Sequence, residues 1–79
     1  MKADIKRGIL RRTILELLEK GSLHYTELDK KVCASCHPFA TTATFASQLR
    51  YLLQKGFIKK ESRGIYQITE IGKKYLQII

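Results

Sequence analysis

The chain has 79 residues, which is enough for one small domain, and 44% of them are hydrophobic, which is enough for a core. Its longest apolar runs are three residues, whereas a membrane-spanning helix needs about 20, so no transmembrane segment is predicted. Charges interrupt the amino terminus and leave no secretion signal, so a cytoplasmic location is expected. Fifteen Lys and Arg against seven Asp and Glu give a net charge of +8. The expected partner is therefore a polyanion, although lysines also serve simply to solvate a surface.

The segment from Asp4 to Lys20 is predicted to be the first helix. Asp4 can cap its amino end, and Gly21 can close it in a left-handed conformation. Lysines and arginines are expected on its outer face. Its apolar residues recur at helical spacing and predict one buried stripe, made of Ile9, Leu10, Thr13, Ile14, Leu17 and Leu18.

A second helix is predicted after a turn at Gly21-Ser22 and a short extended piece at residues 23–25. Thr26, with Asp29 three residues later, is typical of a capped helix start. Pro38 disfavours helical geometry at the residue before it, so this helix should end near Ser35 or Cys36. Its buried face is predicted from a spacing of four residues at Leu28, Val32 and Cys36.

The third helix is predicted over about Ala43 to Lys55, with hydroxyl caps before it and Gly56 as its stop signal. Its apolar positions are Phe45, Leu49, Leu52 and Leu53. The opposite face is expected to carry short uncharged hydrogen-bonding groups rather than Glu and Lys, which favours contact with a partner over an ordinary exposed side. The residues expected on it are Thr41, Thr44, Ser47, Gln48 and Tyr51.

A β-hairpin with a basic tip is predicted from two β-prone runs at residues 57–61 and 65–68 around Ser62-Arg63-Gly64. Thr69 then caps a last helix over Glu70 to Ile79. That helix carries more apolar side chains than the terminal helix of a monomer normally exposes, which indicates a partner surface.

The predicted order of elements is three helices, a hairpin and a last helix. The chain also contains the string Leu49-x-x-Leu52-x-x-x-Gly56-Phe57-Ile58, followed by Tyr66-x-Ile68-Thr69-x-x-Gly72. This order and these strings resemble winged helix-turn-helix transcriptional regulators of the MarR, ArsR and PadR type. The chain is most similar to the minimal forms in archaea and in their viruses and plasmids. The resemblance covers nearly the whole chain and implies a single domain, mainly α with a small β-hairpin wing. Two departures are a long stretch between Val32 and Thr42 and a short wing.

The resemblance implies that the third helix enters the major groove of double-stranded DNA and that the wing contacts the backbone or the minor groove. Gln48 is expected to bond an adenine edge, and the threonines at the helix start are expected near a phosphate. The predicted recognition-helix residues are Thr41, Thr42, Thr44, Ser47, Gln48, Arg50 and Tyr51, and those of the wing and its flank are Lys55, Lys59, Lys60 and Arg63.

A homodimer is expected because so short a chain gains from burying more apolar surface. A two-fold interface would place the recognition helices about 34 Å apart. The alternative is that the same residues cover the first helix within one subunit. The predicted interface residues are Ile5, Ile9, Tyr75, Ile78 and Ile79.

Cys33 and Cys36 form a C-x-x-C pair, for which two small, buried or half-buried free thiols are the simplest interpretation. A disulfide or redox switch is the main alternative, since this motif can lower a thiol pKa. A zinc site with His24 and His37 and a haem attachment at Cys33–His37 are weaker hypotheses. No metal or cofactor is predicted.

An enzyme is not expected, because no catalytic triad, paired carboxylates or phosphate-binding loop is visible. The alternative function is a winged-helix module that binds protein or RNA in a transcription or replication assembly. A protein-docking face would show apolar anchors on the third helix, whereas its predicted face is polar.

Overall fold

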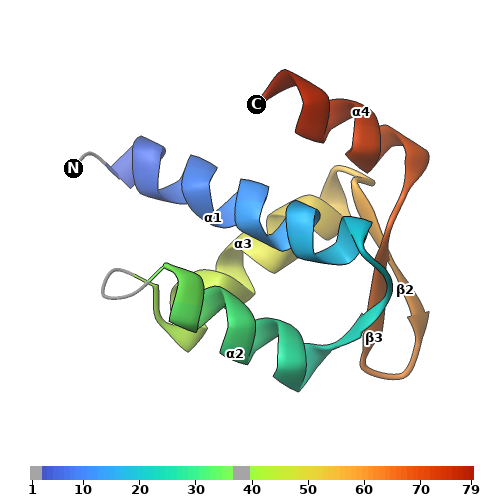
Figure 1. The fold of residues 1–79 in the computed structure, drawn as a ribbon, viewed down its shortest axis with the longest axis horizontal. Coiled ribbons are helices and arrows are strands. Elements are labelled where there is room, and N and C mark those ends of the chain that lie inside the picture. Colours follow the sequence, from blue (N-terminus) through green and yellow to red (C-terminus); the bar gives the residue numbers. More distant parts are fainter. Residues whose placement is uncertain (1–2, 37–39) are drawn as a thin grey trace.

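The structure is a computed structural model that describes residues 3–36 and 40–79 (Figure 1). It confirms the predicted winged helix-turn-helix architecture, in which three helices precede a β-hairpin and a closing helix. The elements in chain order are α1 (Ala3–Glu19), β1 (Leu23–His24), α2 (Tyr25–Ser35), α3 (Thr42–Gln54), β2 (Ile58–Ser62), β3 (Ile65–Ile68) and α4 (Glu70–Ile78).

The sheet has three antiparallel strands in the order β1-β3-β2. The extended piece predicted after the first helix is the strand β1, in which Leu23 pairs with Tyr66 of β3. A bulge interrupts the β2–β3 ladder between Lys60 and Ser62. Gly64 turns the hairpin with a φ of 77°, a conformation that favours glycine. The hairpin is therefore a wing anchored on a third strand.

Side-chain caps begin the helices after α1. Thr41 caps α3 and Thr69 caps α4, as the sequence predicts. The cap predicted at Thr26 is wrong: the N-cap of α2 is His24, whose ring accepts from the Thr26 backbone N–H at 3.4 Å. The strand β1 leads straight into α2, so the last residue of the strand also becomes the cap. The end of α2 at Ser35 agrees with the predicted end near Ser35 or Cys36, and Pro38, on which that prediction relied, lies outside the described residues.

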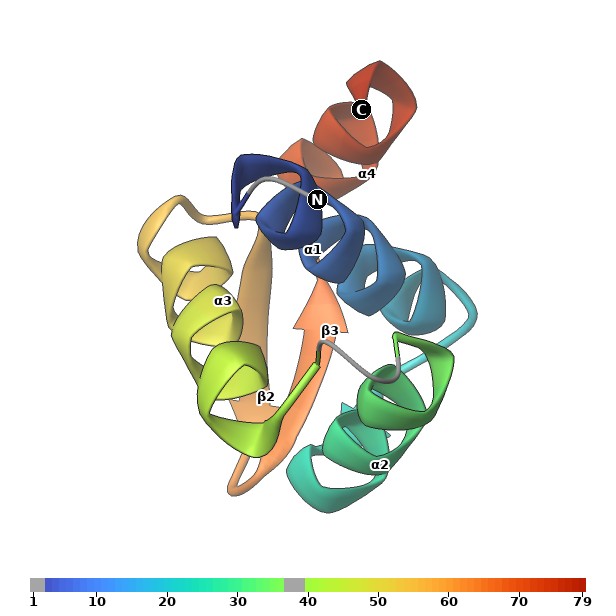
Figure 2. The same cartoon turned by 90° about the vertical axis from the view of Figure 1, so that its left-hand side faces the viewer.

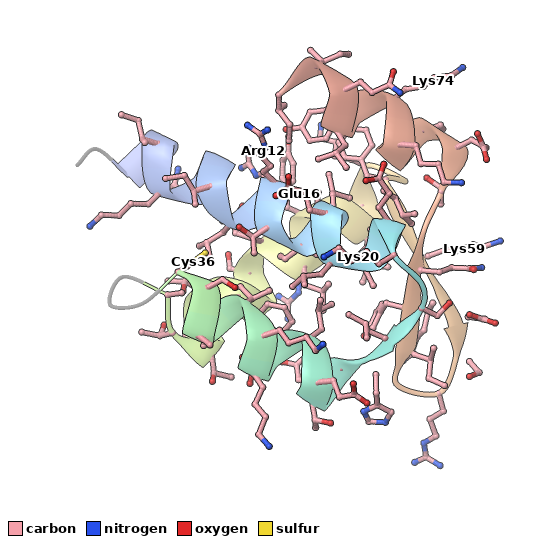
Figure 3. All side chains as sticks on the ribbon, viewed as in Figure 1. Arg12, Glu16, Lys20, Cys36, Lys59 and Lys74 are labelled. Atoms are coloured by element: carbon pink, nitrogen blue, oxygen red, sulfur yellow. The ribbon has the colours of Figure 1, made fainter. Side chains whose placement is uncertain are left out.

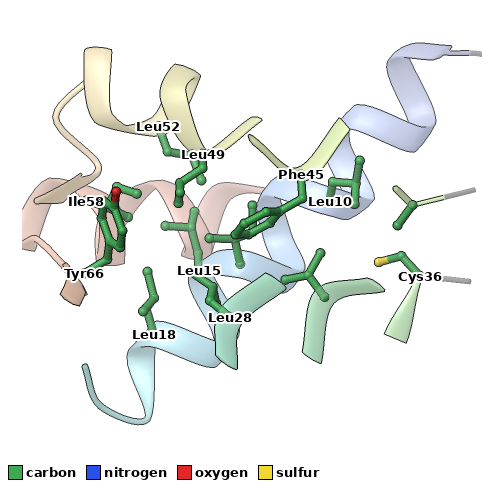
Figure 4. Close-up of a cluster of buried hydrophobic side chains, with 13 residues drawn as sticks. Leu10, Leu15, Leu18, Leu28, Cys36, Phe45, Leu49, Leu52, Ile58 and Tyr66 are labelled. Carbon is green, nitrogen blue, oxygen red and sulfur yellow. The ribbon is translucent and has the colours of Figure 1, made fainter. Parts of the chain in front are cut away.

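The core lies between the three N-terminal helices and the sheet (Figure 4). Phe45, Leu28 and Val32 are fully buried, as predicted. The stripe predicted on α1 is rotated from the observed one, because Leu15 is fully buried whereas Ile9 is 36% exposed. The reason is that α1 packs against α2, α3, α4 and β3 together, so these four elements decide which side of the helix is buried.

The start of α4 is attached to the connection between α3 and β2. Thr69 Oγ1 donates to the Gly56 carbonyl at 2.6 Å, and the Thr69 backbone N–H donates to the Phe57 carbonyl at 3.0 Å. A Cβ on Gly72 would overlap the Phe57 carbonyl oxygen and lie 2.8 Å from Ile68 Cγ1. This close approach explains the glycine in the sequence string.

The hairpin tip and the amino end of α3 lie at one end of the molecule, and α4 lies at the other, in both views (Figures 1 and 2). The helix α1 crosses between them and contacts α4. One end of the molecule therefore presents the amino end of α3 and the tip of the wing, and the opposite end presents α4.

Candidate nucleic-acid interface

One line of exposed side chains runs along the whole of α3. Ala43, Ser47, Arg50 and Gln54 are all exposed, and their spacing places them on one side of the helix. Phe45, Leu49 and Leu52 fix the opposite side by packing into the core. The helix contains no acidic residue. This side of the helix therefore carries mostly small side chains and a positive charge. Such a surface suits a helix that enters a major groove.

Gln48 is not on this face, so its predicted role at a base edge is wrong. Its side chain is 7% exposed, and its Oε1 accepts a hydrogen bond from Arg11 Nε at 2.8 Å. Position 48 lies three residues after Phe45 and four before Leu52, which places it in the buried sector. Sequence reasoning also missed Ala43 and Gln54, although their spacing from Ser47 and Arg50 is the signal that finds them.

Tyr51 is half-buried and covered by cations. The Arg11 guanidinium carbon lies 3.9 Å from the centre of its ring, and Lys55 Nζ lies 5.7 Å from that centre. Both distances are within the range of cation–π attraction. The tyrosine therefore serves as a platform at the flank of α3. Arg11 had no sequence signal that set it apart from the other basic residues of α1.

The three threonines at the amino end of α3 are exposed, and their hydroxyls make local contacts. Thr41 and Thr44 form a reciprocal capping box, in which the Thr41 N–H donates to Thr44 Oγ1 at 2.8 Å. Thr42 Oγ1 donates to Asp29 Oδ2 at 3.3 Å. The negative charge of Asp29 would repel a phosphate at this position. It therefore opposes the phosphate contact expected at the amino end of α3.

The wing carries its cations in the open. Lys59, Lys60 and Arg63 are exposed, and Lys59 projects from the sheet away from the helices (Figure 3). The Tyr25 backbone N–H donates to the Gly64 carbonyl at 2.7 Å, which holds the hairpin tip against the start of α2. Ser22 Oγ donates to Glu61 Oε2 at 2.6 Å. The wing is thus fixed to the body at two points.

Two solved structures are similar to this chain in fold. A transcriptional regulator from Clostridium thermocellum, Cth-833, matches with a TM-score of 0.77 and 27% identity, over 99% of this chain and 82% of its own. PadR from Bacillus subtilis matches with a TM-score of 0.77 and 27% identity, over 91% of this chain and 41% of its own. The chain is therefore similar to PadR in fold. It spans less than half of PadR itself.

The first of these neighbours is a transcriptional regulator, and the two matches confirm the resemblance to winged-helix regulators of the PadR type. No protein-family model and no curated protein matches the sequence. Within residues 3–36 and 40–79, the chain has no helix with the length and apolar character needed to cross a bilayer.

Large apolar side chains are exposed on α1 and α4 of the PadR-like fold. Ile78 is 81% exposed, and Ile5, Ile9 and Ile79 are exposed as well. Tyr75 differs from the expectation of a free interface residue, because it is half-buried and its ring stacks on Phe57 with 4.1 Å between ring centres. Ile71, one of the apolar residues of α4 from which the sequence indicates a partner surface, is 57% exposed.

Both cysteines are free thiols, Cys36 buried and Cys33 half-buried. The pKa of Cys33 is raised, mainly because the thiol is buried. Its hydrogen bond to Asp29 and the charges of Asp29 and Cys36 raise it further. The redox hypothesis relied on a lowered pKa, so the shift has the opposite sign. Among the described residues no three His, Cys, Asp or Glu side chains meet as metal ligands. His37, a member of the zinc and haem hypotheses, lies outside them.

Proposed function

We propose that this chain is a sequence-preferring double-stranded DNA-binding protein that regulates transcription as a cytoplasmic homodimer. In this proposal α3 enters the major groove and the wing formed by β2 and β3 contacts the backbone or the minor groove. The single observation that carries the proposal is the exposed face of α3, which is polar, free of acidic residues and flanked by cations. The net charge of +8 supplies the general attraction to a polyanion.

The proposed base contacts come from the exposed line of α3 and its flank. Arg50 can bond the O6 and N7 atoms of guanine, and Gln54 can bond an adenine edge in the way first expected of Gln48. Ser47 and Thr44 can bond several bases, and Ala43 can contact a thymine methyl. Lys55, Lys59, Lys60 and Arg63 would bind phosphates on either side.

The form of α3 favours DNA over the alternative partners. A protein-docking face is expected to carry large apolar or aromatic anchors at its centre, whereas the central line of α3 carries Ala43, Ser47, Arg50 and Gln54. The major groove of A-form RNA is deep and narrow and excludes such a helix. A B-form duplex is the polyanion whose groove fits it.

The proposed dimer would use the exposed isoleucines of α1 and α4. Isolated apolar side chains are common on surfaces, but several large ones on two adjoining helices support a self-association surface. A two-fold arrangement would set the α3 helices of two protomers about 34 Å apart, one turn of the duplex. The binding site would then be a pseudo-palindrome.

The test is a mobility-shift titration against genomic fragments at two salt concentrations, followed by Arg50→Ala on the preferred fragment. We expect the wild-type chain to select particular fragments and to lose affinity as salt rises. Arg50→Ala should cost about 1–3 kcal/mol on the selected fragment and much less on random duplex. Gln77→Ala, an exposed change on α4, is the control. Binding that ignores salt, or an Arg50→Ala variant that keeps the preference, would contradict the proposal.

A further inference from the structure

Arg11 belongs to α1 but lies against the flank of α3. Its Nε donates to Gln48 Oε1 at 2.8 Å, and its guanidinium carbon is 3.9 Å from the centre of the Tyr51 ring. Gln48 is buried, and Tyr51 is half-buried. The guanidinium is therefore held in one place by a hydrogen bond along one edge and a ring along one face.

These contacts use only part of the guanidinium. An arginine has five N–H donors in a rigid planar fork, and the bond to Gln48 takes the one on Nε. Ring stacking takes none of them. Arg11 is partly exposed, and its two Nη groups form the edge that suits two oxygens of a phosphate.

The charge of Arg11 is retained in this position. Its contacts with Gln48 and Tyr51 are to neutral groups, which position the guanidinium without cancelling its charge. Lys55 lies 5.7 Å from the same ring, so the Tyr51 platform carries two cations. If Arg11 served only to join α1 to α3, its positive charge would not be needed for that role.

We propose that Arg11 binds a phosphate of the DNA backbone beside the groove that α3 enters, with Gln48 and Tyr51 as its positioning residues. Helix α1 then contributes directly to the nucleic-acid interface. This inference rests on the proposed function, because it requires a duplex on the exposed face of α3. In this proposal Gln48 and Tyr51 position Arg11 and do not themselves contact bases.

The adjacent arginine provides a matched control. Arg12 is exposed, and its Nε lies 3.6 Å from Glu16 Oε2, one turn further along α1 (Figure 3). Arg11→Gln and Arg12→Gln remove the same charge from neighbouring positions, of which only Arg11 lies against α3. The experiment measures the affinity of each variant for a random-sequence duplex over a series of salt concentrations.

We expect Arg11→Gln to reduce the slope of log affinity against log salt by about 0.9 for each bound protomer and to weaken binding roughly tenfold. Arg12→Gln should keep the wild-type slope. An unchanged slope for Arg11→Gln, beside salt-dependent wild-type binding, would overturn the inference alone. Wild-type protein that shows no salt-dependent binding would overturn the proposed function with it.

A second measurement needs no substitution and covers the case in which Arg11→Gln does not fold. In the wild-type chain, the Nη protons of Arg11 can be followed by nuclear magnetic resonance during titration with a short duplex. We expect their exchange with water to slow on binding, as for donors engaged by a phosphate. Exchange that stays at the rate of the free protein in a saturated complex would overturn the inference.

Discussion

Asp29 connects the two helices of the helix-turn-helix. Its Oδ1 accepts from Cys33 Sγ at 3.3 Å within α2, and its Oδ2 accepts from Thr42 Oγ1 at 3.3 Å at the first residue of α3. One carboxylate therefore links the last turns of α2 to the start of α3. The same carboxylate opposes ionisation of the Cys33 thiol.

The first prediction concerns Cys33 and pH. Because burial and then Asp29 raise its pKa, the thiol should react with iodoacetamide only at higher pH than in the urea-unfolded chain. Asp29→Asn should lower the pH at which the rate rises. Peptide mass mapping separates Cys33 from Cys36. Equal rates at pH 8 in the folded and unfolded chains would contradict the prediction.

The same shift has a defined effect on stability. A thiol whose pKa is higher in the folded chain stabilises the fold below the unfolded pKa, and this contribution is lost as the pH rises through the folded pKa. The free energy of unfolding should therefore fall on the alkaline side. In Cys33→Ser this part of the fall should be absent.

At the residue scale, the sequence predicted the buried side of α3 better than its exposed side. Phe45, Leu49 and Leu52 are apolar, and their spacing alone identifies a core face. Gln48 is polar and was therefore expected outside, yet it is buried because Arg11 satisfies its side chain. That contact joins positions 37 residues apart in sequence, and no local pattern reports such a pairing.

At the scale of elements, two glycines in helices make a matched pair for the second prediction. A Cβ on Gly72 would overlap the Phe57 carbonyl, whereas a Cβ on Gly8 of α1 meets nothing within 4 Å. Gly72→Ala should destabilise the fold by about 1–3 kcal/mol or more, since a backbone atom must move. Gly8→Ala should stabilise it by about 0.5–1 kcal/mol. Urea unfolding followed by circular dichroism measures both, and equal effects would be inconsistent with the close approach at Gly72.

The third prediction concerns the wing. Arg63→Ala should weaken binding to every duplex by a similar factor and reduce the salt slope by about 0.9 per protomer, since a phosphate contact carries no sequence information. Lys74→Ala removes an equal charge from α4, at the opposite end of the molecule (Figure 3), and should leave the slope unchanged. Equal slopes in the two variants would place the wing outside the interface.

Most element boundaries were predictable because their signals are local. Thr41, Thr69 and Gly56 are turn and cap residues whose chemistry acts within a few positions. The cap at His24 was not predictable, since histidine is an uncommon N-cap and its place depends on the pairing of β1 with β3. The start of α2 was thus decided by the pairing of β1 with β3, which joins residues far apart in the sequence.

At the scale of the whole molecule, the fourth prediction tests the dimer. Ile78 is 81% exposed, so Ile78→Lys should leave the free energy of unfolding of the single chain nearly unchanged. If the side chain is buried between protomers, its loss from both should raise the dimer dissociation constant at least tenfold, since burying one isoleucine is worth about 1.5–3 kcal/mol. Gln77→Lys adds the same charge beside it as a control. Sedimentation equilibrium that gives one constant for both variants would exclude Ile78 from an interface.

The attachment of Thr69 and Gly72 to Gly56 and Phe57 has a mechanical consequence. The helix α3 ends and the strand β2 begins at this joint, and α4 is fastened to it by backbone as well as side-chain bonds. A tilt of α4 therefore displaces the junction between the two parts proposed to hold the duplex. In a dimer joined through α4, the angle between the subunits and the orientation of each wing would be coupled. A rearrangement at α4 would then reach the wing through this joint rather than through the core.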